Sequence, residues 1–598
     1  MVRTIFSFLC LVALVHLPLL RLHAGEPVHI RINQVGYLTE EPKTAILFSE
    51  ARVKETFHVV EIESGRIAMT VKPERSGHPD WGRFGFYYEM DFTRVTEPGQ
   101  YCIEGDRSGH RSRPFYIGDR TYSGLQEELL VFMRQQRCGY NPFLDMVCHQ
   151  RDGRSFYGPM PDSTWVDASG GWHDAGDQLK YLITGSYATA HMLLAFELYP
   201  DRFADVANAW GQPGSNGIPD VLDEAKWGLD WIHKLHAAPD RLIHQVADDR
   251  DHVGWKIPDQ DTSDYGWGSN SYRAAYFATG SPQGLNLYKS EATGVSNLAG
   301  RSAAAMALAS RIWSSYLGDS VYAAKCLRTA ESLYLLGREK EGYQQGNSFG
   351  APYRYGEETW ADDMEWGAAE LFKSTGEKGY LEDAVRYARL AGTDNWMPYD
   401  TASHYQYYPF INPGHFVLHG VVEEPFRDTL SSYYRSGIEH CLQRSGNNPF
   451  QIGIPFIWCL NNLLTGLITQ IILYEKMTGD RRYHPFLVKQ RDWLFGRNPW
   501  GTSMFTGIPK GGEYPVDVHT SVYVLTRQEV PGGLVDGPVY GTIYRSLAGL
   551  SLTEADEFAG LQNEFVVYHD DIGDYSTNEP TMDGTAGSIL MMVHWSRD

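Results

Sequence analysis

The sequence lacks the features of several large functional classes. No Lys/Arg-rich run and no basic arm occurs in its 598 residues, and 52 basic against 74 acidic residues give a formal charge of −22. Nucleic acid is therefore not an expected partner, because its phosphates require a basic surface. The Gly-rich segment 510–512 lacks a nucleotide-binding pattern, and no Gly-x-Ser-x-Gly elbow is present. Neither a phosphate cradle nor a serine hydrolase is indicated.

Cysteine is also scarce, with seven residues scattered along the chain. This scatter does not resemble a dense disulfide framework. Cys326, Cys441 and Cys459 lie in apolar, helix-like stretches, where cysteine usually acts as a small buried side chain. Cys138 and Cys148 stand apart, because a histidine follows Cys148 directly.

Residues 1–24 resemble a secretory signal peptide. Arg3 gives a positive start, residues 5–20 are almost wholly apolar, and Ala24 offers a small cleavage residue. A membrane anchor is less favoured, because the run is short and contains Pro18. Its removal takes away two arginines, so the mature chain has 50 − 74 = −24 charges. We expect an exported, extracellular or periplasmic protein without a transmembrane segment in the mature chain.

The spacing of apolar residues changes once along the remaining chain. Residues 25–118 show short alternating apolar runs between turn residues, which predicts a small β-sandwich. From residue 119 to 598, apolar residues recur at helical spacing, which predicts a mainly α domain with long loops. The clearest helical stretches are 181–198, 302–316, 364–374 and 460–477.

Two acidic clusters point to chemistry. In the first, Asp174 and Asp177 are three residues apart, so a helical turn would aim both carboxylates at one water. The alternative is that they are acids placed favourably at a helix start. The second cluster, residues 568–579, crowds several carboxylates around Glu579. Like charges raise proton affinity, which suits a general acid.

Together the clusters fit inverting cleavage of a glycosidic bond. That reaction needs a protonated carboxylic acid at the leaving oxygen and an ionised carboxylate that activates water on the opposite face. Aromatic residues make up 13% of the chain, and sugar faces stack on such rings.

The motifs resemble those of family-nine glycoside hydrolases. These are segments 167–181 and 568–579, with further matches at 216–228, 404–409 and 496–499. The resemblance spans almost all of residues 120–598 and implies an (α/α)6 barrel. Segments 32–37 and 114–117 are similar to the first and last strands of the immunoglobulin-like domain that precedes the barrel in one branch. There it supports the barrel; a sugar-binding role is the minority alternative.

The resemblance also implies roles for individual residues. Asp177 becomes the general base, Asp174 its partner in orienting water, and Glu579 the general acid. Asp570 and Asp574 would support the acid loop, which is the segment 568–579 that carries Glu579. The expected substrate-binding residues are His404, Tyr408, His519, Tyr575 and Trp360.

A structural zinc site is implied as well. Cys138, Cys148, His149 and His173 resemble the zinc ligands of the branch with the immunoglobulin-like domain. Two thiolates and two imidazoles suit tetrahedral Zn²⁺ with no open position. The alternative is a disulfide between Cys138 and Cys148. Members of the family also bind Ca²⁺, but no calcium ligand set is defined here.

Two departures concern the substrate. The family's cellulases carry a His-x-Arg pair, whereas here His519 is preceded by Asp517 and the arginine is missing. Asp536 stands where a small residue is expected. The added acids favour an amino sugar such as glucosamine; alternatively, loops shift and another residue replaces the arginine.

Three functions compete. The leading one is an exported inverting endo-β-1,4-glucanase, a cellulase acting on glucan chains or their oligosaccharides. The second is an exo-acting enzyme of the same fold that releases glucose, cellobiose or glucosamine. The third is an inactive polysaccharide-binding protein, which the intact Asp174, Asp177 and Glu579 disfavour.

Overall fold

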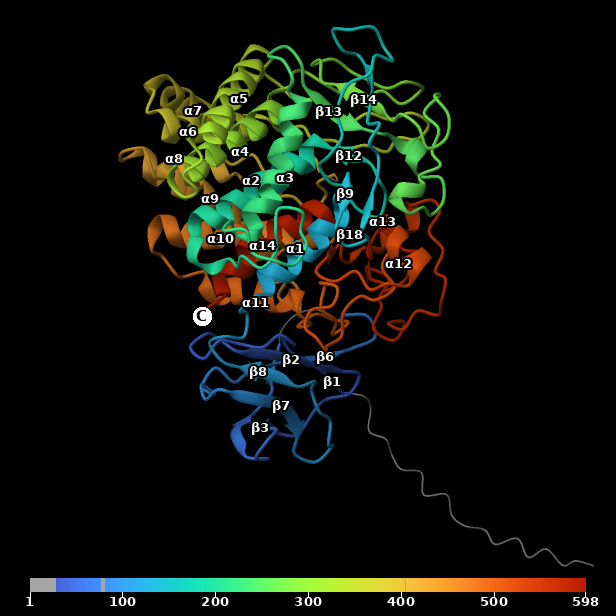
Figure 1. Ribbon diagram of the computed structural model, residues 1–598. Coiled ribbons are helices and arrows are strands. Elements are labelled where there is room, and N and C mark those ends of the chain that lie inside the picture. The colour runs from blue at the N-terminus through green and yellow to red at the C-terminus, as the bar shows by residue number, and fades with distance from the viewer. Residues whose placement is uncertain (1–27, 77–80, 404, 598) are drawn as a thin grey trace, which may run out of the picture.

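A computed structural model describes residues 28–76, 81–403 and 405–597. The predicted signal peptide and His404 lie outside these residues. A small β-rich part, formed by the N-terminal region, lies next to a larger helical part (Figure 1).

The β-rich part is a sandwich of two four-stranded sheets. Strand β2 is buried along its whole length, and alternating side chains of β3 enter the core between the sheets. The immunoglobulin-like prediction is confirmed. The first sheet has the order β1 (Val28–Arg31), β2 (Thr44–Ser49), β6 (Phe86–Asp91) and β5 (Glu74–Arg75). The second has the order β4 (Ile67–Val71), β3 (Phe57–Glu61), β7 (Gly99–Gly105) and β8 (Phe115–Ile117).

The helical part is a barrel of two concentric helix rings. Successive inner helices contact one another and the last closes on the first, while outer helices pack between them. This is the (α/α)6 barrel predicted from the sequence. The inner ring consists of α2 (Leu182–Leu198), α4 (Ser296–Ser315), α6 (Ala361–Thr375), α8 (Pro413–His419), α10 (Leu460–Thr478) and α14 (Met582–Trp595). The outer ring consists of α1 (Leu125–Gln136), α3 (Asp220–Leu235), α5 (Ser320–Glu339), α7 (Lys378–Ala391), α9 (Phe426–Ser445) and α11 (His484–Leu494).

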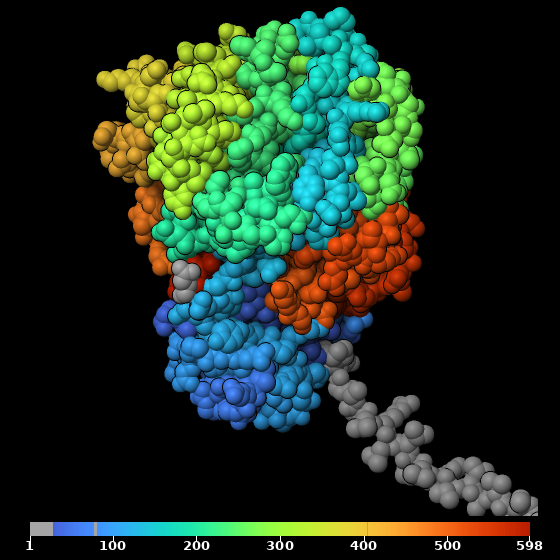
Figure 2. Space-filling model, in the orientation of Figure 1, coloured from blue at the N-terminus to red at the C-terminus, as the bar shows by residue number. Residues whose placement is uncertain are grey.

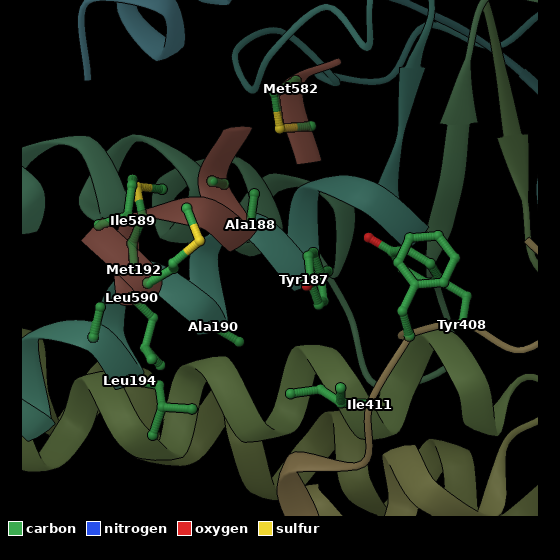
Figure 3. Packing of buried hydrophobic residues seen from close by; sticks show 14 of the residues in the cluster. Tyr187, Ala188, Ala190, Met192, Leu194, Tyr408, Ile411, Met582, Ile589 and Leu590 are labelled. Atoms are coloured by element: carbon green, nitrogen blue, oxygen red, sulfur yellow. The ribbon is translucent and has the colours of Figure 1, made fainter. Parts of the chain in front are cut away.

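Sequence composition separates the two rings. Inner helices such as α2 and α14 are apolar around their whole circumference and almost wholly buried, whereas the outer helix α7 buries only one stripe. Figure 3 shows Met192 of α2 packed near Ile589 and Leu590 of α14. The four helical stretches that the sequence marked most clearly are α2, α4, α6 and α10.

Long loops connect the helices, as the sequence predicted. They contain a four-stranded sheet of order β11-β14-β13-β12 and several two-stranded ribbons. Their strands are β9 (Tyr140–Asn141), β10 (Met146–Val147), β11 (Arg154–Phe156), β12 (Lys180–Tyr181), β13 (Ile243–Val246), β14 (Ala274–Phe277), β15 (Leu534–Val535), β16 (Val539–Tyr540), β17 (Val566–Val567) and β18 (Pro580–Thr581). Short helices are α12 (Ser521–Thr526), α13 (Gly541–Ser546) and 3₁₀ turns at Pro200–Arg202, Asp249–Asp251 and Pro258–Gln260.

The sandwich packs directly against the barrel (Figure 2). Glu41 accepts two hydrogen bonds from Arg491, at 2.7 and 2.8 Å, and both residues are buried. The Asn33 amide donates to Asp492 at 2.7 Å. Trp81 adds edge contacts to Trp500. Paired charges and aromatic packing thus fix the sandwich to the outer ring. Across the described residues, no helix is long and apolar enough to cross a membrane.

Candidate active site

The loop before α2 carries Asp174 and Asp177. Helix α2 begins only at Leu182, so the expectation of a helical turn through the two aspartates is wrong. Asp177 Oδ1 instead accepts the backbone N–H of Leu179 at 2.9 Å, a side-chain turn that competes with helix. The carboxyl of Asp174 accepts the hydroxyls of Thr184, at 2.5 Å, and Tyr355.

Asp174 and Asp177 have different surroundings. Burial, together with the charges of Asp583 and Asp177, raises the pKa of Asp174 well above its usual value. Such a group suits the orientation of water by hydrogen bonding. Asp177 Oδ2 lies 3.2 Å from His252 Nε2. Burial lowers the pKa of His252, but the hydrogen bond and charge of Asp177 outweigh it and the net pKa is raised.

Glu579 reaches the same place from the end of the chain. It lies just before α14, and β18 fixes this segment by pairing with β15. Glu579 Oε1 accepts the N–H of Gly176 at 2.8 Å. A Cβ at Gly176 would lie 2.2 Å from the His519 carbonyl oxygen and 2.7 Å from Glu579 Oε1, so the approach requires glycine. Burial, then the charges of Asp536 and Asp177, raise the pKa of Glu579 well above its usual value.

Asp177 and Glu579 both line a cavity of about 550 Å³. Its walls combine rings with polar groups, as sugar sites do. The rings are Trp255, Tyr353, Trp458 and Tyr575, with the imidazoles of His252 and His519. Trp255 meets His519 at 4.6 Å between ring centroids.

The structure brings together only some of the predicted substrate-binding residues. His519 and Tyr575 line the cavity, with His519 Nδ1 2.7 Å from the Ile572 carbonyl oxygen. Tyr408 is fully buried below it and donates to Asp583 at 3.0 Å. Trp360 lies outside the cavity lining and contacts Tyr387 edge-on.

A cluster of cysteine and histidine side chains adjoins the loop that carries Asp174. The ligand atoms of Cys138, Cys148, His149 and His173 all lie within 4.8 Å of one another, which makes a candidate metal centre. Cys138 and Cys148 are not joined by a disulfide, so the disulfide alternative is wrong. This is the one group of three or more Cys, His, Asp or Glu side chains that converges in the part of the chain described.

The candidate metal centre connects to the loop of Asp174 and Asp177 in two ways. His173 directly precedes Asp174 in the chain. The second connection is a chain of buried charges. His149 Nε2 lies 3.2 Å from Asp261, which pairs with Lys256 at 3.1 Å. Lys256 pairs with Asp251 at 3.0 Å, and Asp251 accepts the N–H of Gln178, next to Asp177, at 2.9 Å.

Comparison with known proteins decides the family. Residues 122–592 match glycosyl hydrolase family 9, and residues 26–110 match the cellulase N-terminal ig-like domain. The chain belongs to glycosyl hydrolase family 9. The family assignment made from the sequence motifs is confirmed.

Individual relatives agree with this family-9 assignment. Endoglucanase C of Cellulomonas fimi is 25% identical over 95% of this chain, which spans about half (52%) of that relative. A xyloglucan-specific endo-beta-1,4-glucanase of Bacteroides ovatus is 24% identical over 85% of each protein. A metagenome-derived family 9 endoglucanase has a similar crystal structure, with a TM-score of 0.76 and 25% identity, covering 95% of this chain and 99% of that one.

The acid loop of this family-9 chain is held by its own carboxylates. Asp570 accepts the N–H groups of Val516, at 2.8 Å, and Asp517, at 3.0 Å. Asp574 contacts His569 Nδ1 at 2.7 Å. The hydroxyl of Tyr575 donates to the Ala548 carbonyl at 2.7 Å. The supporting role expected for Asp570 and Asp574 stays a prediction.

The two departures from the family pattern have different settings. The Asp517 carboxylate faces the hydroxyl of Tyr523. Asp536 is buried and accepts the Trp458 indole N–H at 2.9 Å and the Cys459 thiol at 3.1 Å. Cys459 was expected to act only as a small apolar side chain, and this contact adds a polar role. Ser521 lines the cavity two residues after His519, where the arginine is missing.

Sequence reasoning missed several residues of the site. His252, Tyr353 and Trp458 line the cavity, and Tyr355 bonds Asp174. Asp583, on α14, accepts the Tyr405 hydroxyl at 2.6 Å, and its charge helps to raise the pKa of Asp174. Its place four residues after Glu579 was the available signal, because both acids then lie at one helix end.

Proposed function

We propose that this protein is an inverting endo-β-1,4-glucanase. Glu579 protonates the leaving glycosidic oxygen, and Asp177, with Asp174, positions and deprotonates the attacking water. The observation that carries the proposal is that Gly176 brings the two acidic segments together. Its N–H donates to the Glu579 carboxyl, the next residue is Asp177, and both acids line one cavity. Inversion needs a protonated acid and a separate water-activating base in this way.

The charge arrangement supports these roles. The raised pKa of Glu579 favours the protonated form that a general acid needs. His252 faces Asp177, and an imidazolium there pairs with the carboxylate form of the base. The rings of Trp255, Trp458 and Tyr575 give the cavity apolar faces for glucose units.

Relatives favour a β-1,4-linked glucan as substrate. The Cellulomonas fimi relative is named an endoglucanase, and the Bacteroides ovatus relative is named as xyloglucan-specific. We propose glucan chains or their oligosaccharides for this chain, acted on after export through the signal peptide at residues 1–24. The sandwich would support the barrel through its contacts with Arg491 and Asp492.

We also propose that the metal centre holds a structural Zn²⁺. Two thiol and two imidazole donors fit its tetrahedral preference and leave no position for a reactive water. Asp261 bonds the second nitrogen of His149, which fixes the tautomer that presents Nδ1 to the metal. Bound zinc would hold His173 and so the loop that carries Asp174.

The decisive experiment follows soluble glucan during hydrolysis. We expect the viscosity of carboxymethylcellulose to fall well before many reducing ends accumulate. Release of monomer at constant viscosity would establish the exo-acting alternative. Turnover of glucosamine oligomers in place of cello-oligosaccharides would move the assignment to amino sugars. Binding without any hydrolysis would leave only a polysaccharide-binding protein.

A further inference from the structure

Asp536 is an acid that the proposed mechanism leaves unused. It is 1% exposed, and its charge acts on Glu579. Its backbone N–H donates to the Glu579 carbonyl at 3.0 Å. This bond continues the pairing of β15 with β18, so the two acidic residues are held in register.

Asp536 and Glu579 differ in the donors that meet their carboxyls. Asp536 Oδ2 accepts the Trp458 indole N–H at 2.9 Å, and Oδ1 accepts the Cys459 thiol at 3.1 Å. Glu579 Oε1 accepts the backbone N–H of Gly176 at 2.8 Å. Hydrogen-bond donors stabilise a carboxylate over the neutral acid. The two donors on Asp536 therefore favour a charge there.

The other titratable groups around Asp536 are acidic. Asp574 belongs to the acid loop, Asp583 to α14, and the Cys459 thiol to the start of α10. Two buried carboxyls among such neighbours cannot both ionise easily, so their protons are shared and released in separate steps.

We infer that Asp536 and Glu579 form a coupled carboxyl pair in which Asp536 takes the first negative charge and Glu579 keeps the proton for catalysis. Asp536 is then a positioning residue, which acts on the reaction through Glu579. The inference deepens the proposed function and rests on the role of Glu579 as general acid.

The direction of the pKa values agrees with this division. Burial raises the pKa of Asp536 to about 8, while its hydrogen bonds to Trp458 and Cys459 lower it. The pKa of Glu579 is raised well above its usual value by burial and then by the charge of Asp536. An acid whose pKa is raised stays protonated to higher pH, so the alkaline limit of activity should lie higher than without Asp536.

The test is the pH profile of kcat/KM on cellohexaose. Asp536→Asn removes the charge and keeps an oxygen that can accept the Trp458 indole. We expect the alkaline limb of the profile to move down by about one pH unit, because a neighbouring like charge raises a carboxyl pKa by about that much or more. An alkaline limb within 0.2 units, on the order of experimental error, of the wild type overturns the inference.

Two further variants separate charge from structure. Asp536→Glu keeps the charge, so its alkaline limb should stay close to that of the wild type even if kcat falls. A downward shift in this variant as well would assign the effect to packing and overturn the inference. Glu564→Gln is the control, since it neutralises an exposed acid and should leave the profile unchanged.

Failure of this inference differs from failure of the proposed function. If wild-type protein does not hydrolyse β-1,4-glucan, the proposed function is wrong. If wild-type protein is active and Asp536→Asn keeps its alkaline limb, only the coupled pair is wrong. Unfolding curves of each variant ensure that a folded protein is compared.

Discussion

The carboxyl groups on the two sides of the cavity have different hydrogen-bond partners and neighbouring charges. On the base side, Asp174 and Asp177 meet hydroxyl and imidazole donors, on a loop joined to the metal centre. On the acid side, Glu579 meets a backbone N–H and lies beside the carboxyl of Asp536. In the proposed mechanism, these surroundings divide equal chemical groups into water-positioning residues and a proton donor.

The largest expected effect comes from removing either side. We predict that Glu579→Gln and Asp177→Asn each lower kcat by about 10²–10⁴-fold, the usual contribution of general acid or base catalysis. Initial rates on cellohexaose measure this, and calorimetry should find sugar binding largely retained. Glu564→Gln changes an exposed acid that precedes the segment 568–579, and it serves as the control. Wild-type rates in either variant would remove that residue from the mechanism.

Loss of the metal centre should affect the base side next. We predict that Cys148→Ser loses bound zinc and lowers the free energy of unfolding by about 3–5 kcal/mol, because metal-binding energy contributes to folding. Metal analysis and denaturant unfolding measure the two effects. Cys326→Ser is the matched control, since this buried thiol lies outside the cluster. Equal metal content and stability in Cys148→Ser would contradict the site.

Gly176 is the point where the two sides meet. We predict that Gly176→Ala lowers kcat/KM by about 10–100-fold, because a misplacement of reacting groups by about 1 Å can cost about 100-fold in rate. The added methyl group would collide with the His519 carbonyl and Glu579, which separates the acid from the base loop. Gly379→Ala is a control in open surroundings within α7. Unchanged kinetics in Gly176→Ala would show that this contact is not used.

The smallest effect should come from a single hydroxyl on the base side. We predict that Tyr355→Phe lowers kcat by about 3–10-fold, because one hydrogen bond contributes about 0.5–1.5 kcal/mol. Tyr355 donates to Asp174, so its loss loosens the group that orients water. The exposed Tyr316→Phe is the control. A loss as large as that of Asp177→Asn would mean that Tyr355 takes part in proton transfer.

Much of this comparison could be predicted from the sequence. Long ordered motifs identified Asp174, Asp177 and Glu579 as candidates, and helical periodicity identified inner helices such as α2 and α10. Local signals failed where distant segments meet. His252, Tyr355 and Trp458 come from separate loops, and no spacing in the chain predicts that they converge with Asp177.

The form of the Asp174 loop also escaped prediction. Two acids three residues apart favoured a helical turn, but the Asp177 side chain bonds the Leu179 N–H and competes with helix. Asp536 looked like a change in substrate preference. Its burial beside Trp458, Cys459 and Glu579 could be seen only in three dimensions.

The central claim, a separate acid and base acting on opposite faces of the sugar, is tested most directly by the anomeric form of the product. Proton NMR during the first minutes of cellohexaose hydrolysis should detect the α-anomer at each new reducing end, because inversion converts the β-linkage. Initial formation of the β-anomer would show retention and contradict the assignment of Glu579 and Asp177.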